Sequence, residues 1–146
     1  MTQPNAPQTH TQTPTPVTSF EFACHVANLA EAKKSDNTAI LDVSQISGFA
    51  DYFVFATGHS STQITAIGHH IAEMMKAQGI TPLHYEDDQS GQWHLLDYGD
   101  VVVHVMRDEA RQHYDLEAYW SHGSPLSRDE WMNAGRTSSQ QHRQSA

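Results

Sequence analysis

The chain has 146 residues, with 8 Lys and Arg against 17 Asp and Glu and a formal net charge of −9. One domain is expected, since domains commonly have ~100 to 200 residues. The acidic balance argues against a protein that grips nucleic acid mainly by neutralising phosphates, and a single cysteine excludes an intramolecular disulfide and a multi-cysteine zinc site. No apolar run reaches the ~20 residues of a membrane span and no signal-peptide layout begins the chain, so we expect a soluble, cytoplasmic protein.

Composition divides the chain into three parts. Residues 1–19 carry no formally charged side chain and little apolar area, and residues 121–146 are similar in kind, although Leu126, Trp131 and Met132 could form a short docked turn. We expect an N-terminal disordered tail, a domain over residues 20–120 and a mostly disordered C-terminal tail. The predicted domain holds 5 Lys and Arg against 15 Asp and Glu, so the acidity belongs to the domain itself.

The first predicted element is a helix from about Ser19 to Lys34. Thr18 and Glu21 have the spacing of a capping box, in which two side chains satisfy backbone N–H groups at a helix start. Two strands follow, at residues 38–43 and 51–57. The second is rich in aromatic and β-branched residues, which favour strands.

A second helix has the clearest pattern in the sequence. Ser60 and Gln63 have capping-box spacing, and Gly79 and Pro82 are residues that end helices. Apolar residues recur between them at helical spacing: Ile64, Ile67, Ile71, Met74 and Met75.

Three short strands are predicted next, at residues 83–86, 93–97 and 101–106, and the last two read as a hairpin. The run 101–103 is valine without polar alternation, which is typical of a central strand covered on both faces. A polar helical turn from Arg107 then leads to residues that would close the domain: Tyr114, Leu116, Tyr119 and Trp120.

The resulting order is α-β-β-α-β-β-β-α. We predict an α+β fold with a mixed five-stranded sheet and the two long helices packed on one of its faces.

Catalytic and metal-binding chemistry is weakly supported. His69 and His70 are adjacent on a helix and point about 100° apart, whereas two helical ligands need a separation of three or four residues. The other candidate histidines, His84, His94 and His104, lie on three predicted strands without a ligand-spaced carboxylate. Cys24 falls beside the apolar positions of the first helix, where a buried, inert thiol is expected. We therefore predict no cofactor and no metal site.

The segment Gly58–Ser61 joins a strand to a helix N-terminus, where backbone N–H groups favour anions. The arrangement is similar to the glycine-serine turn of nucleotidyltransferases. Those enzymes commonly position metal ions with an Asp-x-Asp pair on the following strand, and the strand ending at Glu86 offers one carboxylate. Helix capping by Ser60 is the simpler interpretation, and a nucleotide-binding enzyme remains the alternative.

The strand at residues 93–97 carries the most informative pattern. With a period of two, Trp93, Leu95 and Asp97 share one face, while His94 and Leu96 share the other. If the helices cover one side of the sheet, a large part of the other side lies open and these residues form a docking surface. Alternatively, Trp93 belongs to the core beneath the final segment.

The sequence resembles the ribosomal silencing factor RsfS (Iojap) family between Phe22 and Trp120. The resemblance is carried by Ala50-Asp-Tyr-Phe-Val-Phe-Ala-Thr-Gly58, by Leu96-Asp-Tyr-Gly-Asp-Val-Val-Val-His-Val105 and by the closing Tyr114, Leu116-Glu117 and Trp120. One departure is Glu86-Asp87, where members commonly have Glu-Gly. Both predicted tails lie outside the resemblance.

The resemblance implies a nucleotidyltransferase-like topology without the catalytic carboxylates. It further implies a non-enzymatic factor that binds the large ribosomal subunit through protein uL-fourteen, blocks joining of the small subunit and represses translation. Combining it with the strand pattern and the acidic charge gives a predicted partner-binding set: Trp93, Leu95, Asp97, Tyr98, Asp100, Met106 and Glu109. No direct grip on nucleic acid and no membrane contact are expected, and a homodimer through the open face is an alternative.

Overall fold

The computed structural model describes residues 18–115, 118 and 121–134. The elements with their bounds are α2 (Ser19–Ala32), β1 (Asp36–Asp42), β2 (Tyr52–Gly58), α3 (Ser61–Ala77), β3 (His84–Asp87), β4 (Trp93–Asp97), β5 (Val101–Arg107), α4 (Asp108–Tyr114) and β6 (Ser124–Pro125). Both long helices and the five predicted strands are confirmed to within a few residues. Of the residues expected to close the domain, Leu116, Tyr119 and Trp120 lie outside the described part.

A single mixed sheet forms the centre of the molecule. Its strand order is β3-β4-β5-β2-β1-β6. The β2–β5 pair is parallel and the other neighbouring pairs are antiparallel. The predicted five strands become six, because Ser124 and Pro125 pair with Asp42 and Leu41 at the β1 edge. A strand of two residues is too short to show alternation in a sequence.

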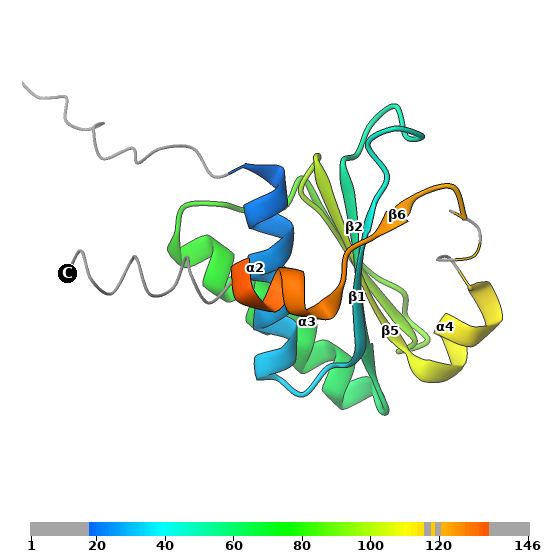
Figure 1. Ribbon diagram of the computed structural model, residues 1–146. Helices are drawn as coiled ribbons and strands as arrows, with labels where there is room; N and C mark the ends of the chain where they lie inside the picture. Colours follow the sequence, from blue (N-terminus) through cyan, green and yellow to red (C-terminus); the bar gives the residue numbers. More distant parts are fainter. Residues whose placement is uncertain (1–17, 116–117, 119–120, 135–146) are drawn as a thin grey trace, which may run out of the picture.

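Helices α2 and α3 cover one side of the sheet, as predicted, and α4 lies on the other (Figure 1). Alternation within the strands divides the side chains between two apolar layers. The layer beneath the helices includes Val54, Leu96 and Val103, and the layer on the opposite side includes Phe53, Phe55 and Val102. Every β5 residue from Val101 to Met106 is buried, which confirms that this strand is central.

Both long helices begin at a side-chain cap. Thr18 accepts from the Glu21 N–H while the Glu21 carboxylate accepts from the Thr18 N–H, completing the predicted box. At α3 only half of the box forms. Ser60 accepts from the Gln63 N–H, but the Gln63 side chain accepts instead from the N–H of His59 and donates to the carbonyl of Lys34.

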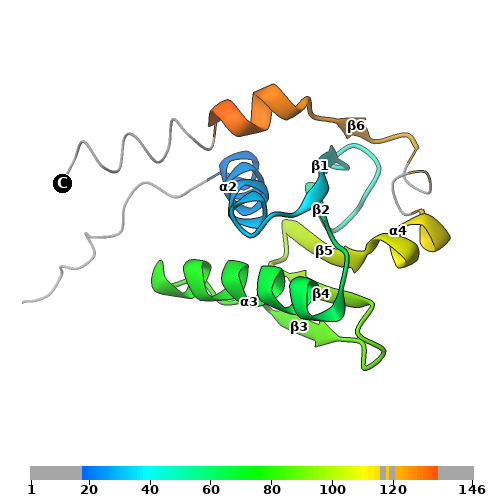
Figure 2. The same ribbon diagram turned by 90° about the horizontal axis from the view of Figure 1, so that it is seen from below.

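The folded part of the chain continues past residue 120, the end of the domain predicted from the sequence. Beyond β6, residues 128–134 are helical and run beside α2 (Figure 2). The Trp131 side chain is 1% exposed within the helix-side layer. The amide of Asn28 donates to the carbonyl of Trp131, and Arg128 forms an ion pair with Glu31 at 2.6 Å. The segment considered as a docked turn is therefore a short helix that packs on α2, and its Trp131 belongs to the core.

Candidate functional site

Strand β4 presents alternating side chains to the two sides of the sheet. His94 and Leu96 are buried on the helix side, whereas Trp93, Leu95 and Asp97 are half-buried on the opposite side. The backbone spacing places Trp93 and Asp97 ~13 Å apart along the strand. These three residues form what we call the β4 face.

Trp93 is held from two directions. Its backbone N–H donates to the Asp88 carboxylate at 3.0 Å, and its indole Nε1–H donates to Nδ1 of His104 at 3.3 Å. Asp88 also accepts from the Gln92 N–H and the Ser90 hydroxyl. Desolvation by itself would raise the pKa of the Asp88 carboxyl, but the hydrogen bonds from Ser90, Gln92 and Trp93 together outweigh it and hold the pKa below its ordinary value. The loop before β4 is therefore organised around one carboxylate, which fixes where Trp93 begins the strand.

The apolar layer beside the β4 face is more covered than predicted. Phe53, Phe55 and Val102 are at most 7% exposed, and Leu95 packs against this layer from the β4 side. We expected the side of the sheet opposite α2 and α3 to be largely open, and for β2 and β5 this expectation is wrong, because their side chains on that side are buried. The β4 residues on this side remain half-buried, and edge strand β3 beside them is largely exposed.

Asp97 and Asp100 lie at the hairpin between β4 and β5. The Asp97 carboxylate accepts from the N–H of Gly99 at 2.8 Å, and Gly99 has a φ of +91° that favours glycine. The Asp100 side chain is exposed. The backbone carbonyl of Asp100 accepts from the N–H groups of Asp51 and Tyr52. Two carboxylates therefore stand at this end of the β4 face.

Three other residues of the predicted partner-binding set lie apart from the β4 face or are inaccessible. Tyr98 packs on the helix side, with its ring 5.0 Å from that of Phe22, and burial raises the pKa of its hydroxyl to about 12. Met106 is cross-strand from Trp93 but is fully buried. Glu109 is exposed on α4, where its carboxylate lies 3.5 Å from the Arg107 guanidinium.

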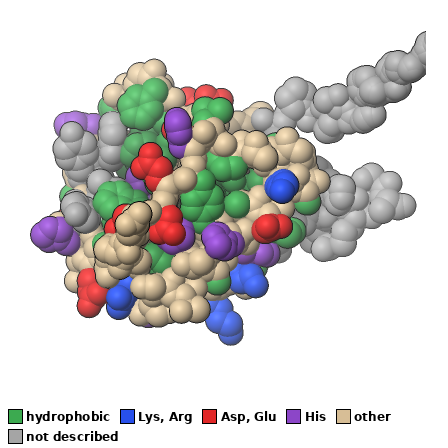
Figure 3. All heavy atoms as spheres, turned by 180° about the vertical axis from the view of Figure 1, so that it is seen from behind, with side chains coloured by type: hydrophobic (Ala, Val, Ile, Leu, Met, Phe, Trp, Pro, Cys, Tyr) green, Lys and Arg blue, Asp and Glu red, His purple; other side chains and the backbone are tan. Residues whose placement is uncertain are grey.

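Edge strand β3 adds to the acidic character beside β4. Glu86 is exposed and stands opposite Leu95 in the register, while His84 stands opposite Asp97. Viewed from this edge of the sheet, hydrophobic and acidic side chains lie next to one another over the middle of the molecule (Figure 3). The half-buried Trp93 and Leu95 of the β4 face thus have carboxylates at the hairpin end of the strand and on the neighbouring edge strand β3.

In the Gly58–Ser61 turn, both serine hydroxyls form hydrogen bonds within the protein. Ser60 caps α3, and the Ser61 hydroxyl donates to the carbonyl of Gly91 at 3.0 Å. A side chain at Gly58 would lie 2.8 Å from Ile64, so the turn is packed tightly against α3. Helix capping, the simpler interpretation of this turn, is what Ser60 does.

His59, in the same turn, bridges two carboxylates. Its Nδ1 lies 3.1 Å from Asp108 at the start of α4, and its Nε2 lies 3.1 Å from Asp36 at the start of β1. The hydrogen bond to Asp108, followed by that to Asp36, raises the pKa of the imidazole. This bridge ties together three elements that are distant in the sequence.

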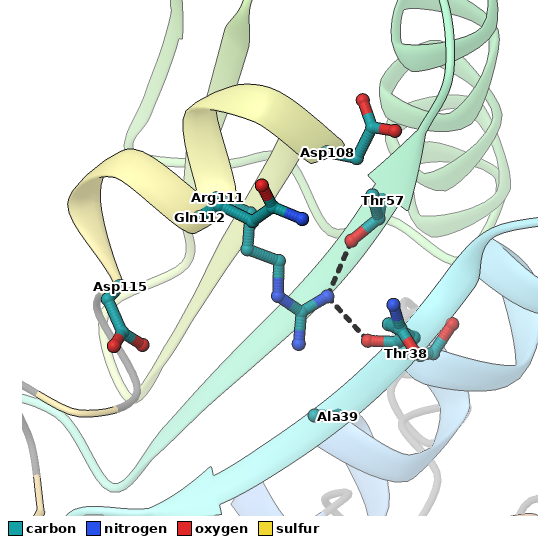
Figure 4. A pocket seen from close by; sticks show the side chains of 8 residues that line it. Thr38, Ala39, Thr57, Asp108, Arg111, Gln112 and Asp115 are labelled. Carbon is teal, nitrogen blue, oxygen red and sulfur yellow. Dashed lines mark hydrogen bonds between the residues drawn. The ribbon is translucent and has the colours of Figure 1, made fainter.

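A polar cavity of about 590 Å³ lies between β1, β2 and α4 (Figure 4). Arg111 extends from α4 across it, donating to the carbonyl of Asn37 and the hydroxyl of Thr57. The guanidinium also lies 5.5 Å from the ring centre of Phe55. Arg111 thereby anchors α4 to the two strands.

Neither a metal cluster nor a membrane helix is found in the parts of the chain described above. Over those residues, His, Cys, Asp and Glu form no group of three suited to a metal ion. None of their helices combines the length and hydropathy that a membrane crossing requires.

His104 also belongs to this site, although the sequence pattern marks it only as a candidate metal ligand. The hairpin places it opposite Leu95 and two residues along β5 from Met106, the residue opposite Trp93, so His104 and Trp93 are diagonal neighbours on one side of the sheet. The signal was present in the sequence, because the predicted hairpin implies that register, but the direction of the indole N–H is visible only in three dimensions.

Comparison with known proteins identifies the family. The profile described as "Ribosomal silencing factor during starvation" (RsfS) matches residues 16–146. A ribosomal silencing factor from Bacillus subtilis is 35% identical over 107 residues, covering 73% of this chain and 91% of the relative. Another, from Halalkalibacterium halodurans, is 37% identical over 93 residues, covering 64% and 80%.

The fold agrees with this match. A crystal structure of a Chromobacterium violaceum protein superimposes with a TM-score of 0.67 at 31% identity, covering 73% of this chain and 88% of that one. From the profile, the identities and the shared fold together, we conclude that the chain belongs to the ribosomal silencing factor family, RsfS.

Proposed function

We propose that this protein represses translation by binding protein uL-fourteen of the large ribosomal subunit and blocking the small subunit. The family resemblance supplies the partner, and the β4 face supplies a surface that suits it. The single observation that carries the proposal is the half-buried Trp93 and Leu95 row flanked by carboxylates.

The apolar part of the face suits a protein partner. Tryptophan is enriched among residues that dominate binding energy, particularly where it is partly enclosed and water is excluded around it. Trp93 is fixed by two hydrogen bonds before any partner arrives. A pre-ordered anchor loses little conformational entropy on binding, which favours affinity.

The charges suit a basic protein surface. Asp97 and Asp100 stand at one end of β4, and Glu86 lies on the neighbouring edge strand. Carboxylates are repelled by ribosomal RNA phosphates and attracted to Lys and Arg, so they would steer the domain to a protein epitope. We assign Asp97 and Asp100 to this pairing, with Glu109 further out on α4.

Obstruction requires only bulk. A domain of about 100 residues has a radius of gyration near 13 Å, so its presence on a subunit interface excludes the opposing surface. The mechanism needs no bond to be made or broken, and we propose that the protein is not an enzyme.

Cosedimentation with isolated large subunits tests the surface. Trp93→Ala should weaken binding roughly 30-fold, the loss typical of an anchor tryptophan. Asp97→Asn keeps an acceptor for the Gly99 N–H while removing the charge, so its loss should be smaller and should fade at high salt.

Glu73→Lys is the matched control, because Glu73 is exposed on α3 and therefore on the opposite side of the sheet. It should bind as the unmodified protein does. Equal binding by Trp93→Ala, Asp97→Asn and Glu73→Lys would remove the β4 face from the interface.

The alternative is that this surface forms a homodimer. Light scattering over a dilution series would detect such a dimer as a molecular mass that rises with protein concentration.

A further inference from the structure

Three buried side-chain atoms of the described residues have no hydrogen-bond partner: the Tyr98 hydroxyl, Nε of Arg107 and Nε2 of His104. Of these residues, His104 is the one that contacts Trp93 of the β4 face. His104 lies on β5 and is 8% exposed. An unpaired buried polar atom costs ~1 to 3 kcal/mol, so such an atom calls for a compensating role. The other ring nitrogen, Nδ1, accepts the hydrogen bond from the Trp93 indole.

The hydrogen bond with Trp93 fixes the protonation of His104. An indole N–H is only a donor, so Nδ1 of His104 must accept. The proton of the neutral ring therefore sits on Nε2. A doubly protonated ring would present N–H against N–H and break the contact with Trp93. Burial lowers the pKa of His104 to about 4, which keeps the ring neutral near pH 7.

The imidazole is itself held in place by aromatic neighbours. It stacks on Phe55 with 5.4 Å between ring centres and an interplanar angle of 17°. Phe53 meets it edge-on at 5.2 Å. These contacts hold the imidazole ring in one orientation, so the position of its acceptor Nδ1 is fixed. The hydrogen bond to Nδ1 therefore also fixes the orientation of the Trp93 indole.

We infer that His104 is a positioning residue for partner binding, which acts by accepting the indole N–H of Trp93 and so fixing the orientation of the anchor. This inference rests on the proposed function, since it assigns a role to His104 only through Trp93. It also limits the chemistry of the partner residue that contacts Trp93. The indole N–H is already used inside the protein, so the partner residue at Trp93 contacts ring surface and is apolar or cationic.

A double-substitution cycle on large-subunit binding tests the inference. His104→Phe keeps an aromatic ring but has no acceptor, and should weaken binding about 5- to 10-fold, the value of one hydrogen bond. His104→Gln restores an acceptor and should recover most of this loss. In a Trp93→Phe background, where no N–H remains to be oriented, His104→Phe should change binding less than about 2-fold.

A spectroscopic readout separates positioning from general support of the fold. The Nε1–H resonance of Trp93, identified by its loss in Trp93→Phe, should shift in His104→Phe and return toward its original position in His104→Gln. If the Phe variant does not fold, His104→Leu lacks the acceptor equally and replaces it.

The outcomes are distinguishable. An equal loss from His104→Phe with and without the Trp93 indole would overturn the inference, as would unchanged binding by a folded His104→Phe variant. If Trp93→Ala binds normally, the proposed docking surface itself fails. If Trp93→Ala loses binding and His104→Phe does not, only the positioning role fails.

Discussion

Gly68 of α3 lies directly against the hydroxyl of Tyr85 on β3. A methyl group built on Gly68 would come within 2.5 Å of that oxygen. The hydroxyl in turn lies 2.9 Å from Nδ1 of the buried His94. The absence of a side chain at Gly68 is therefore what allows α3 to approach the edge of the sheet that carries the β4 face.

Gly68→Ala should destabilise the protein by ~1 to 3 kcal/mol, because the added methyl group forces a shift in a packed region. Helix propensity alone predicts the opposite sign, since alanine favours helix over glycine by ~1 kcal/mol. Urea unfolding measures the difference.

The Tyr85→Phe background provides the control for this prediction. Without the hydroxyl, the nearest atoms to the new methyl group are 3.4 and 3.6 Å away, which is ordinary contact. Gly68→Ala should then be neutral or stabilising. The same destabilisation in both backgrounds would show that the Tyr85 hydroxyl is not the obstacle.

Trp131 should be among the most important residues for stability, although it lies beyond the end of the domain as predicted from the sequence. Trp131→Ala should cost ~3 to 5 kcal/mol, the usual value for a buried aromatic side chain. Arg128→Ala is the matched control. Arg128 stacks on the Trp131 ring and pairs with Glu31, but it is half-exposed, so its removal should cost under ~1 kcal/mol. Similar small losses for both would contradict the docking of residues 124–134.

The segment after residue 120 has little local periodicity, so its docking could not be predicted from the sequence. Leu126, Trp131 and Met132 were visible as apolar residues, but a two-residue strand and one short helix give too few repeats for a period to show. By contrast, α3 was predictable because Ile64, Ile67 and Ile71 repeat over several turns. Local periodicity reveals long elements, whereas docking depends on distant partners such as Asn28.

The candidate site shows a similar limit. Alternation placed Trp93, Leu95 and Asp97 on one side of β4, as the structure shows. Tyr98 and Met106 belong to the same predicted partner-binding set, yet the Tyr98 ring packs against Phe22 of α2 and Met106 is fully buried. Period-two patterns state which side a strand residue takes, but not how much of that side is covered.

The His59 bridge should make stability depend on pH in the range above pH 6.5. The hydrogen bonds to Asp108 and Asp36 raise the pKa of His59 in the folded state above its ordinary 6.5. The contribution of the bridge is therefore fully present below pH 6.5 and is lost as the pH rises through the folded-state pKa. Melting temperatures across this range should fall more for the unmodified protein than for His59→Gln. Parallel pH profiles would mean that the bridge contributes nothing.

His104 should make the protein less stable as the pH falls below 6.5. Its pKa is about 4 when folded against 6.5 ordinarily, so the unfolded chain binds this proton first as the pH falls. Stability should decline between pH 6.5 and 4, by up to ~3 kcal/mol from this residue. Urea unfolding of His104→Phe should show a shallower decline over the same interval. A decline equally steep in the variant would assign the acid sensitivity to other groups.

The proposed obstruction is tested most directly by measuring subunit joining itself. Isolated large and small ribosomal subunits are mixed with a saturating amount of this protein, and their association is followed by light scattering. We expect the unmodified protein and Glu73→Lys to suppress the association signal, and Trp93→Ala at the same concentration to restore it. Association at the normal rate and extent in the presence of the unmodified protein would contradict the proposed obstruction.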